Sequence, residues 1–295
     1  MTDTVIGLIG GSGLGQALLG EIQGESHAVE TPFGPPSGPI IRGRCQGVDV
    51  AFLSRHGEGH LIPPAAVPYR ANIYALKSLG VTRIIAGGAT GSLREEMRPR
   101  DLVVVDQVID KTSRRIGTFF DQRGIAAHVE FSEPFCPTLR AALLAASGDV
   151  DTTVHDGGTY VCMEGPAFST IAESRMHRAW GGDLIGMTCM PEAKLAREAE
   201  LCYALLALPT DYDCWRPHEP GIDKQTLLNE IMDNLKAATA NAVALMKATL
   251  AGMAAMKLDD CPCRHALELA IWSDRAGIPP QAIERLGILL PRADR

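Results

Sequence analysis

The chain has 295 residues, of which 46% are hydrophobic, 21% charged and 5% aromatic, and its formal net charge is −7. This composition supports a sizeable core, and the acidic balance without Lys/Arg runs leaves no electrostatic footprint for nucleic acid or an anionic lipid surface. No apolar run approaches the roughly 18 residues that span a bilayer, and the first residues lack the basic segment of a secretory signal. We therefore expect a cytoplasmic protein with no nucleic-acid or membrane partner.

The chain begins with apolar segments that end in glycine or polar residues. Residues 5–9 predict a buried strand that runs into a glycine-rich loop at 10–15, where backbone N–H groups can approach an anion. The loop invites a dinucleotide-binding interpretation, but Gln16 stands where the third glycine of G-x-G-x-x-G should fall, so that fingerprint fails. Residues 40–44 and 48–54 predict a β-hairpin.

Strands and helices then alternate along the chain. The predicted helices cover residues 69–79, 137–146, 170–180, 191–200 and 223–253. The predicted strands cover residues 81–86, 102–109, 184–187 and 201–209, residues 152–163 predict a strand pair or a bent strand, and a second glycine-rich loop covers 87–93. No linker or repeat interrupts this order. We expect one α/β domain over residues 1–295, with a central mixed β-sheet flanked by helices and glycine-rich loops gathered at one end.

Two carboxylates, Asp211 and Asp213, follow the predicted strand 201–209. Residues two apart on a strand project on the same side, so the pair can share one small ligand at the strand's C-terminal end. Neighbouring carboxylates accept hydrogen bonds and push one pKa upward, which suits a donor-rich ligand or a proton transfer. An aspartate pair that caps the next helix or contacts solvent is the alternative.

Other polar side chains also come directly after predicted strands: Ser12, Arg55, His56 and Thr188. Taken singly, they can be a helix N-cap, a surface ion pair or a turn residue. Strand ends converge in α/β folds, so together they predict a pocket. An arginine fork, hydroxyls and glycine-rich backbone suit a small oxyanion such as phosphate.

Eight cysteines are too few for a disulfide scaffold in a chain of this length. Cys261 and Cys263 are separated only by Pro262, with His265 nearby. A structural zinc site usually needs wider spacing and a second ligand pair, which the neighbouring sequence lacks. We therefore expect no metal, and a redox-labile or structural cysteine pair.

Ten sequence blocks occur in the order seen in methylthioadenosine phosphorylases, which belong to the trimeric purine nucleoside phosphorylases. The blocks are Gly10-Gly11-Ser12-Gly13, Thr31-Pro32-Phe33-Gly34, Arg55-His56-Gly57, Tyr69-Arg70-Ala71-Asn72, Gly91-Ser92-Leu93-Arg94-Glu95-Glu96, Thr118-Phe119-Phe120-Asp121, Glu164-Gly165-Pro166, Met187-Thr188, Pro191-Glu192-Ala193 and Thr210-Asp211-Tyr212-Asp213-Cys214-Trp215. The chain resembles this family over residues 5 to about 250, and its Cys-Pro-Cys tail is similar to that of bacterial members.

The resemblance implies that phosphate attacks the anomeric carbon of S-methyl-5'-thioadenosine, releasing adenine and 5-methylthioribose 1-phosphate in methionine and purine salvage. It implies a purine nucleoside phosphorylase-like fold and a homotrimeric pentosyltransferase that needs no cofactor, with inorganic phosphate as co-substrate. The implied phosphate site comprises Ser12, Arg55, His56, Ala89 and Thr188. The implied nucleoside contacts are Met187 on the ribose, Phe168, Ser169, Asp211 and Asp213 on the base, and Leu227, Leu228 and His128 near the 5' group. A helical tail over about 255–292 and His128, both from a neighbouring subunit, would help to close the site.

The aspartate pair also predicts which base is bound. Adenine presents an amine donor beside the acceptor N7, so one carboxylate can accept from the amine while a protonated carboxyl donates to N7. Unpaired groups cost such sites a factor of about 10⁴ in selectivity, so we expect a preference for 6-aminopurines. Asp211 is the expected proton donor, with Asp213 supporting it.

Four positions depart from the family pattern: Gly88, Ala167, Gly186 and Lys224. Gly88 removes a hydroxyl that usually contacts phosphate. Gly186 replaces a common asparagine and occurs in relatives that prefer methylthioinosine. Lys224 lies near the expected 5' wall, or is a solvated residue at a helix start. A purine nucleoside or methylthioinosine phosphorylase and a non-catalytic nucleoside-binding protein therefore remain the alternatives.

Overall fold

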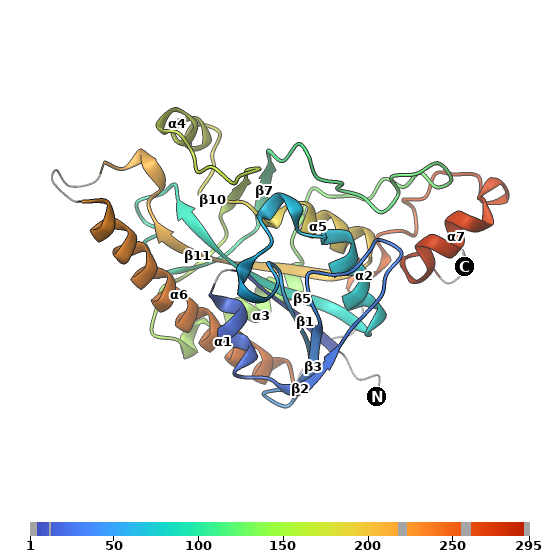
Figure 1. Cartoon of the computed structure of the whole chain (residues 1–295), viewed down its shortest axis with the longest axis horizontal. Coiled ribbons are helices and arrows are strands. Elements are labelled where there is room, and N and C mark those ends of the chain that lie inside the picture. The colour runs from blue at the N-terminus through green and yellow to red at the C-terminus, as the bar shows by residue number, and fades with distance from the viewer. Residues whose placement is uncertain (1–4, 12, 218–222, 255–260, 292–295) are drawn as a thin grey trace.

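The computed structural model describes residues 5–11, 13–217, 223–254 and 261–291, and in them a mixed β-sheet of eleven strands is covered by helices on both faces (Figure 1). The strands are β1 (Val5–Gly10), β2 (Gln23–His27), β3 (Ile40–Cys45), β4 (Val48–Ser54), β5 (Val81–Ser92), β6 (Leu102–Val104), β7 (Gln107–Asp110), β8 (Val154–Asp156), β9 (Thr159–Cys162), β10 (Leu184–Gly186) and β11 (Cys202–Asp211). The helices are α1 (Leu14–Leu19), α2 (Tyr69–Ser78), α3 (Pro137–Ala145), α4 (Ile171–Ala179), α5 (Cys189–Glu198), α6 (Lys224–Met253) and α7 (Pro280–Leu286). The predicted α/β class with a mixed central sheet is confirmed.

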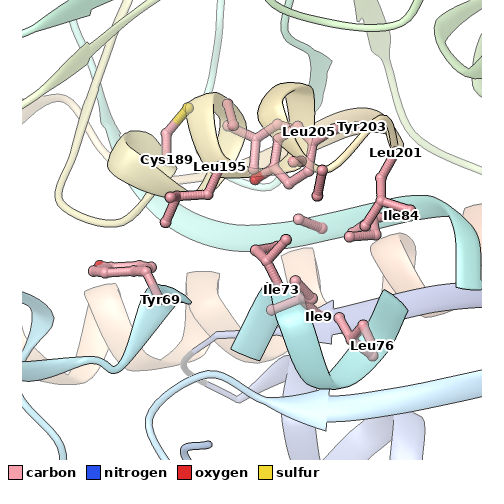
Figure 2. Close-up of a cluster of buried hydrophobic side chains, with 14 of the residues drawn as sticks. Ile9, Tyr69, Ile73, Leu76, Ile84, Cys189, Leu195, Leu201, Tyr203 and Leu205 are labelled. Atoms are coloured by element: carbon pink, nitrogen blue, oxygen red, sulfur yellow. The ribbon is translucent and has the colours of Figure 1, made fainter. Parts of the chain in front are cut away.

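Four parallel strands form the centre of the sheet, in the order β4, β1, β5, β11. Parallel strands are buried on both faces, and every residue of β1 is buried. One apolar cluster lies on the face covered by α2 and α5, and Figure 2 shows Ile73 and Leu76 of α2 opposite Leu195 of α5 and Leu205 of β11. The second cluster joins the other face to α1, α3 and α6. The sheet is thus held rigidly between two helical layers.

Most predicted elements occur where the sequence placed them. The hairpin of β3 and β4 forms, because Gln46 and Gly47 adopt the positive φ angles of 51° and 79° that a tight turn requires. The long helix over 223–253 is α6, and the side chain of Asp223 caps it by accepting from the N–H groups of Gln225 and Thr226.

Three predictions about elements were wrong. The edge strand β2 was missed because its residues are polar and mostly exposed, so no apolar alternation marks it. The predicted strand 102–109 is two strands, β6 and β7, which pair with different neighbours. The predicted glycine loop at 87–93 is largely the second half of β5, held as a strand by pairing with β11.

Residues 261–291, the described part of the C-terminal segment, form short 3-10 turns and the helix α7. This segment packs beside the loop that carries His128, where the His128 N–H donates to Ala270 O at 2.9 Å and the Trp272 ring lies 4.7 Å from the His128 ring, tilted by 52°. Figure 1 shows α7 at the opposite end of the molecule from α4 and the start of α6. No helix in the described ranges is long and apolar enough to cross a membrane.

Candidate active site

The C-terminal ends of β1 and β4 lie beside the middle of β5, and β5 and its neighbour β11 continue past them. Backbone pairing sets Gly10 of β1 beside Ser54 of β4 and Gly87 of β5, and the Arg55 N–H donates to Gly10 O at 2.9 Å. Arg55, the residue that follows β4, therefore lies directly beside the end of β1. The ends of parallel strands are where α/β folds place their ligands. Of the predicted residues that the structure describes, Arg55 and Thr188 come together here, on either side of Gly88.

Arg55 is completely buried and is held as a fork. Its Nε and Nη2 each donate to one oxygen of Glu192 at 2.8 Å, and its Nη1 donates to Gly87 O at 3.0 Å. Burial alone would lower the pKa of Arg55, but the charge of Glu192 and the hydrogen bonds to it raise that pKa above its ordinary value. The guanidinium is therefore a fixed positive charge at the strand ends.

Gly88 and Thr188 lie against the same guanidinium. A Cβ atom added at Gly88 would lie 3.6 Å from Arg55 Nη1 and 3.7 Å from Thr188 Oγ1. Ala89 follows on β5, opposite Leu208 of β11. A hydroxyl, a cation and glycine backbone thus surround one small space, which is the chemistry of an oxyanion pocket.

His56 is neutral in this site. Its Nδ1 lies 2.7 Å from Ile62 O, and since a carbonyl only accepts, Nδ1 carries the proton. Burial lowers the pKa of His56 to about 4 against the opposing effect of this hydrogen bond, and the nearby charge of Arg55 adds to the lowering. The other ring nitrogen, Nε2, is then an acceptor, suited to an O–H group of a protonated phosphate.

Met187 is held in place through its backbone by Arg115. Arg115 Nη1 donates to the carbonyls of Met187 and Met190, both at 2.6 Å, and its Nε donates to Glu164 Oε1 at 3.0 Å. The Met187 side chain packs against Gly165, where a Cβ atom would lie 2.5 Å from its sulfur. This clamp fixes the segment between β10 and α5 that carries both Met187 and Thr188.

Asp211 and Asp213 lie together at the end of β11, although by a different geometry from the one that strand alternation predicts. Asp211 is the last residue of the strand, whereas Asp213 begins a short 3-10 turn with a φ of 41°. The Asp213 N–H donates to Asp211 Oδ2 at 3.0 Å, and the Thr210 hydroxyl donates to Asp211 Oδ1 at 2.8 Å. Asp213 Oδ2 is buried and has no hydrogen-bond partner within the described ranges. A buried acceptor without a donor is costly, so this oxygen is suited to accept an N–H from a ligand.

Only some of the residues predicted to contact the base and the 5' group lie near the aspartates. Ser169 O accepts from Cys214 Sγ at 3.2 Å, which places Ser169 beside the aspartate turn, whereas the Phe168 side chain is 85% exposed. Leu227 lines a cavity of about 360 Å³ together with Asp211. Leu228 is not among the cavity's lining residues and is 52% exposed.

Three further predicted positions need separate statements. His128 lies with the C-terminal segment and not with the aspartates. Lys224 is an exposed residue at the start of α6, as the solvated interpretation predicts. Ser12 lies outside the described residues.

The departure at Gly186 has a packing reason. A Cβ atom at this position would lie 1.9 Å from Tyr160 Oη and 2.5 Å from its Cζ, so the buried phenol fills the space that a side chain would need. The position of the Tyr160 side chain therefore requires glycine at position 186. Ala167, another departure, is exposed.

Sequence reasoning gave no role to three residues that organise the site: Glu192, Arg115 and Asn234. Glu192 fixes Arg55 and also accepts from Tyr203 Oη at 2.8 Å, and its one sequence signal was its place in the Pro191-Glu192-Ala193 block. Asn234 Nδ2 donates to Thr210 O at 2.9 Å and so supports the residue before Asp211. Arg115 and Asn234 carried no local signal because their partners are distant in sequence.

A buried arginine and a hydroxyl beside glycine backbone, with a carboxylate pair at the end of the adjoining strand, suit an enzyme that brings a small oxyanion to an organic substrate. Residues 5–251 match the model of the phosphorylase superfamily, and the chain belongs to that family.

Curated relatives cover almost the whole chain. The S-methyl-5'-thioadenosine phosphorylase of Geobacter sulfurreducens is 48% identical over 292 residues, which are 98% of each chain. The methylthioadenosine phosphorylase solved from an antarctic soil metagenomic library is 43% identical, with a TM-score of 0.89 over 99% of this chain and 100% of that chain. The Schistosoma mansoni methylthioadenosine phosphorylase solved with tubercidin is 35% identical, with a TM-score of 0.80 over 90% of this chain and 96% of that chain.

Proposed function

We propose that the chain catalyses the phosphorolysis of S-methyl-5'-thioadenosine to adenine and 5-methylthioribose 1-phosphate. Curated relatives of this name match it at 41 to 49% identity, most of them over nearly the full chain. The observation that carries the proposal is the buried, unpartnered Asp213 oxygen beside Asp211, on the strand next to the Arg55 pocket. The enzyme is a pentosyltransferase that serves methionine and purine salvage.

The two ends of the site are spaced for a nucleoside. Gly88 lies at the anion pocket, and Gly91, three residues further along β5, is paired with Asp211. Three strand residues span about 10 Å, which leaves room for one sugar between a phosphate and a base. Met187, fixed by Arg115, belongs to the segment that borders this interval.

The phosphate end supplies orientation and charge. Arg55, Ala89, Thr188 and Ser12 would bind the phosphate, and His56 Nε2 would accept from its O–H group. A phosphate oxygen then attacks the anomeric carbon from one face while the bond to the purine nitrogen breaks on the other, and the bonding electrons leave with the base. Holding both reactants in place accounts for a large part of such a rate enhancement.

The base end supplies the proton. The Asp213 oxygen would accept from the exocyclic amine, and a protonated Asp211 would donate to N7 as the base leaves. Phe168 and Ser169 would contact the purine, and Leu227, Leu228 and the neighbouring subunit's His128 would cover the 5' group. A 6-oxopurine would place its carbonyl oxygen against a carboxylate, which agrees with the preference of S-methyl-5'-thioadenosine phosphorylases for 6-aminopurines. Gly186 gives no support to methylthioinosine as substrate, because Tyr160 accounts for it.

The assembly and conditions form part of the same proposal. Cys202 begins β11 and packs against the C-terminal segment, whereas Asp211 ends the strand about 30 Å away. The tail of a chain thus lies far from its own aspartates, which supports closure by a neighbouring subunit in a homotrimer. Phosphate is the co-substrate and no organic cofactor takes part. A cytoplasmic location fits the metabolic role of the relatives.

A kinetic comparison of Asp211→Asn and Asp213→Asn tests the proposal. We expect Asp211→Asn to lower kcat on S-methyl-5'-thioadenosine by about 10²- to 10⁴-fold, the range of general acid catalysis, because the amide cannot give up a proton to N7. Asp213→Asn should mainly reduce the preference for adenine over hypoxanthine nucleosides. Asp149→Asn, in a short turn before β8, is the control and should leave kcat unchanged.

The assay measures release of free base with and without phosphate, with inosine as competitor. Base release that is independent of phosphate, or a clear preference for inosine, would contradict the proposal.

A further inference from the structure

Four cysteines converge in one place away from the active site. The Sγ atoms of Cys136, Cys202, Cys261 and Cys263 all lie within 4.8 Å of one another, and all four residues are buried. Cys136 precedes α3, Cys202 begins β11, and the other two flank Pro262 in the C-terminal segment. We call this set the four-cysteine cluster. Three segments that are distant in sequence meet there.

The spacing of the sulfurs approaches a tetrahedral metal site. Zinc–sulfur bonds of about 2.3 Å place four thiolates about 3.8 Å apart at the corners of a tetrahedron. Cys136 Sγ and Cys261 Sγ are already 3.5 Å apart, and no pair exceeds 4.8 Å. Closing the cluster on an ion therefore requires side-chain shifts of about 1 Å. Four soft sulfur ligands without nitrogen or oxygen favour zinc over the hard cations.

The surroundings of the cluster favour thiolates. Cys136 is the N-cap of the nine-residue helix α3. A helix N-terminus stabilises a thiolate, and donors around a metal site orient its ligands. The Thr138 hydroxyl donates to Cys261 Sγ at 3.9 Å. Part of the outer shell that thiolate ligands need is therefore present.

The sequence could not reveal this set. The second ligand pair that Cys261 and Cys263 lacked is supplied by Cys136 and Cys202, which lie more than a hundred and about sixty residues earlier in the chain. His265, the residue that first suggested a metal, instead pairs through Nδ1 with Glu268 at 2.6 Å. The prediction of no metal rested on the lack of a second ligand pair, and the fold supplies such a pair.

We propose that the four-cysteine cluster is a structural zinc site that ties the C-terminal segment to α3 and to the start of β11. Binding forms four zinc–sulfur bonds and releases the thiol protons to solvent. The cluster lies at the opposite end of β11 from Asp211, so the ion plays no part in the reaction. This proposal stands independently of the proposed function.

Elemental analysis of the wild-type protein is the first test. The intact protein, purified with a reductant and without chelator, should contain about one zinc per chain. Exchange of the zinc for cobalt should give the visible absorption of tetrahedral thiolate coordination. A zinc content near zero per chain overturns the proposal. Thiol titration and the mass of the protein then show whether the cysteines are free thiols or disulfides, and either result leaves the proposal overturned.

Variants localise the ion. Cys263→Ser should lose most of the zinc and lower the melting temperature by about 5 °C or more, while phosphorolysis at low temperature is retained. Cys45→Ser is the matched control, because Cys45 is also buried but lies outside the cluster, and it should keep its zinc. Zinc content unchanged in Cys263→Ser would place the ion elsewhere and overturn the assignment. If Cys263→Ser does not fold, zinc content and the cobalt spectrum of the wild type still decide.

Discussion

Gly88 shows how much one missing hydroxyl can matter at the residue scale. The position borders both the Arg55 guanidinium and the Thr188 hydroxyl, and its surroundings leave ordinary van der Waals space for a small side chain. The departure from the family pattern is therefore a lost contact and not a steric necessity.

We expect Gly88→Thr to lower the KM for phosphate by about 3- to 10-fold, because its hydroxyl adds one hydrogen bond to a charged ligand. Gly88→Ala is the matched control, since it adds the Cβ atom without the hydroxyl. Initial rates at saturating nucleoside and varied phosphate measure the effect. Equal KM values for the two variants would show that the hydroxyl has no role.

The protonation of His56 gives a second prediction at this scale. Its pKa is about 4 in the folded chain and about 6.5 in the unfolded chain. Between these values the unfolded state binds more protons, so this residue makes stability rise with pH from about 4 to 6.5 and lowers it on acidification. The full difference corresponds to about 3 kcal/mol for this largely buried ring.

Unfolding of the wild type and His56→Gln in phosphate-free buffer between pH 4 and 7 tests this. The wild type should lose stability relative to the variant as the pH falls through this window. Glu198 acts in the opposite direction, because burial raises its pKa to about 7, so only the difference between the two proteins isolates His56. His27→Gln on β2 serves as control, and parallel curves for wild type and His56→Gln would refute the assignment.

Residue chemistry was the part of the site most accessible from the sequence. Arg55, Thr188 and the aspartates were found because each follows a strand that its apolar residues reveal. Glu192 and Arg115 act through partners 137 and up to 75 residues away, as the hydrogen bonds of Arg55 and Arg115 show, and local sequence patterns carry no information on such pairs.

At the scale of elements, a residue of β9 determines which residue β10 can carry beside it. Their parallel pairing aligns Cys162 with Gly186, and the Tyr160 phenol occupies the space beside Gly186 that a side chain would need. Gly186 thus allows β10 to lead into the segment with Met187 and Thr188, which we propose to border the phosphate and the sugar.

We expect Gly186→Ala to destabilise the fold by about 1–3 kcal/mol, because the added methyl overlaps the Tyr160 hydroxyl and overpacking costs this much. The KM for phosphate should rise as Thr188 is displaced. Denaturant unfolding and phosphate kinetics are the measurements, with Gly38→Ala as control because no described atom lies near a Cβ added there. Wild-type stability in Gly186→Ala would contradict the packing explanation.

Apolar periodicity predicted long elements well and short or polar ones badly. The helix over 223–253 and the buried strands at 5–9 and 201–209 carry strong patterns. The strand β2 has no such pattern, and β5 continues through glycines that normally indicate a loop. Pairing with β11 decides that case, and pairing partners are not visible in a single sequence.

At the scale of the whole molecule, the position of the C-terminal segment favours a shared active site. His128 and Trp272 lie together, far from the aspartates of their own chain, and Trp272 is 73% exposed. An exposed aromatic side chain next to a proposed substrate contact suits a subunit boundary.

Subunit complementation tests this arrangement. In a trimer, a His128→Ala chain next to an Asp211→Asn chain should form a site with an intact Asp211 and an intact His128. We therefore expect the reassembled mixture to regain part of the wild-type KM for S-methyl-5'-thioadenosine. Each variant alone provides the control, and a mixture that shows only the His128→Ala KM, or a monomeric mass in solution, would contradict the shared site.

The pairing of β5 with β11 has a further consequence, for how this chain can evolve. The distance between the anion pocket and the aspartates is set by backbone register, with Gly91 aligned to Asp211, and not by any side chain. Substitutions that alter base preference therefore leave the phosphate end in place. Base choice and phosphate use are separable traits, so selection can change one of them without first rebuilding the other.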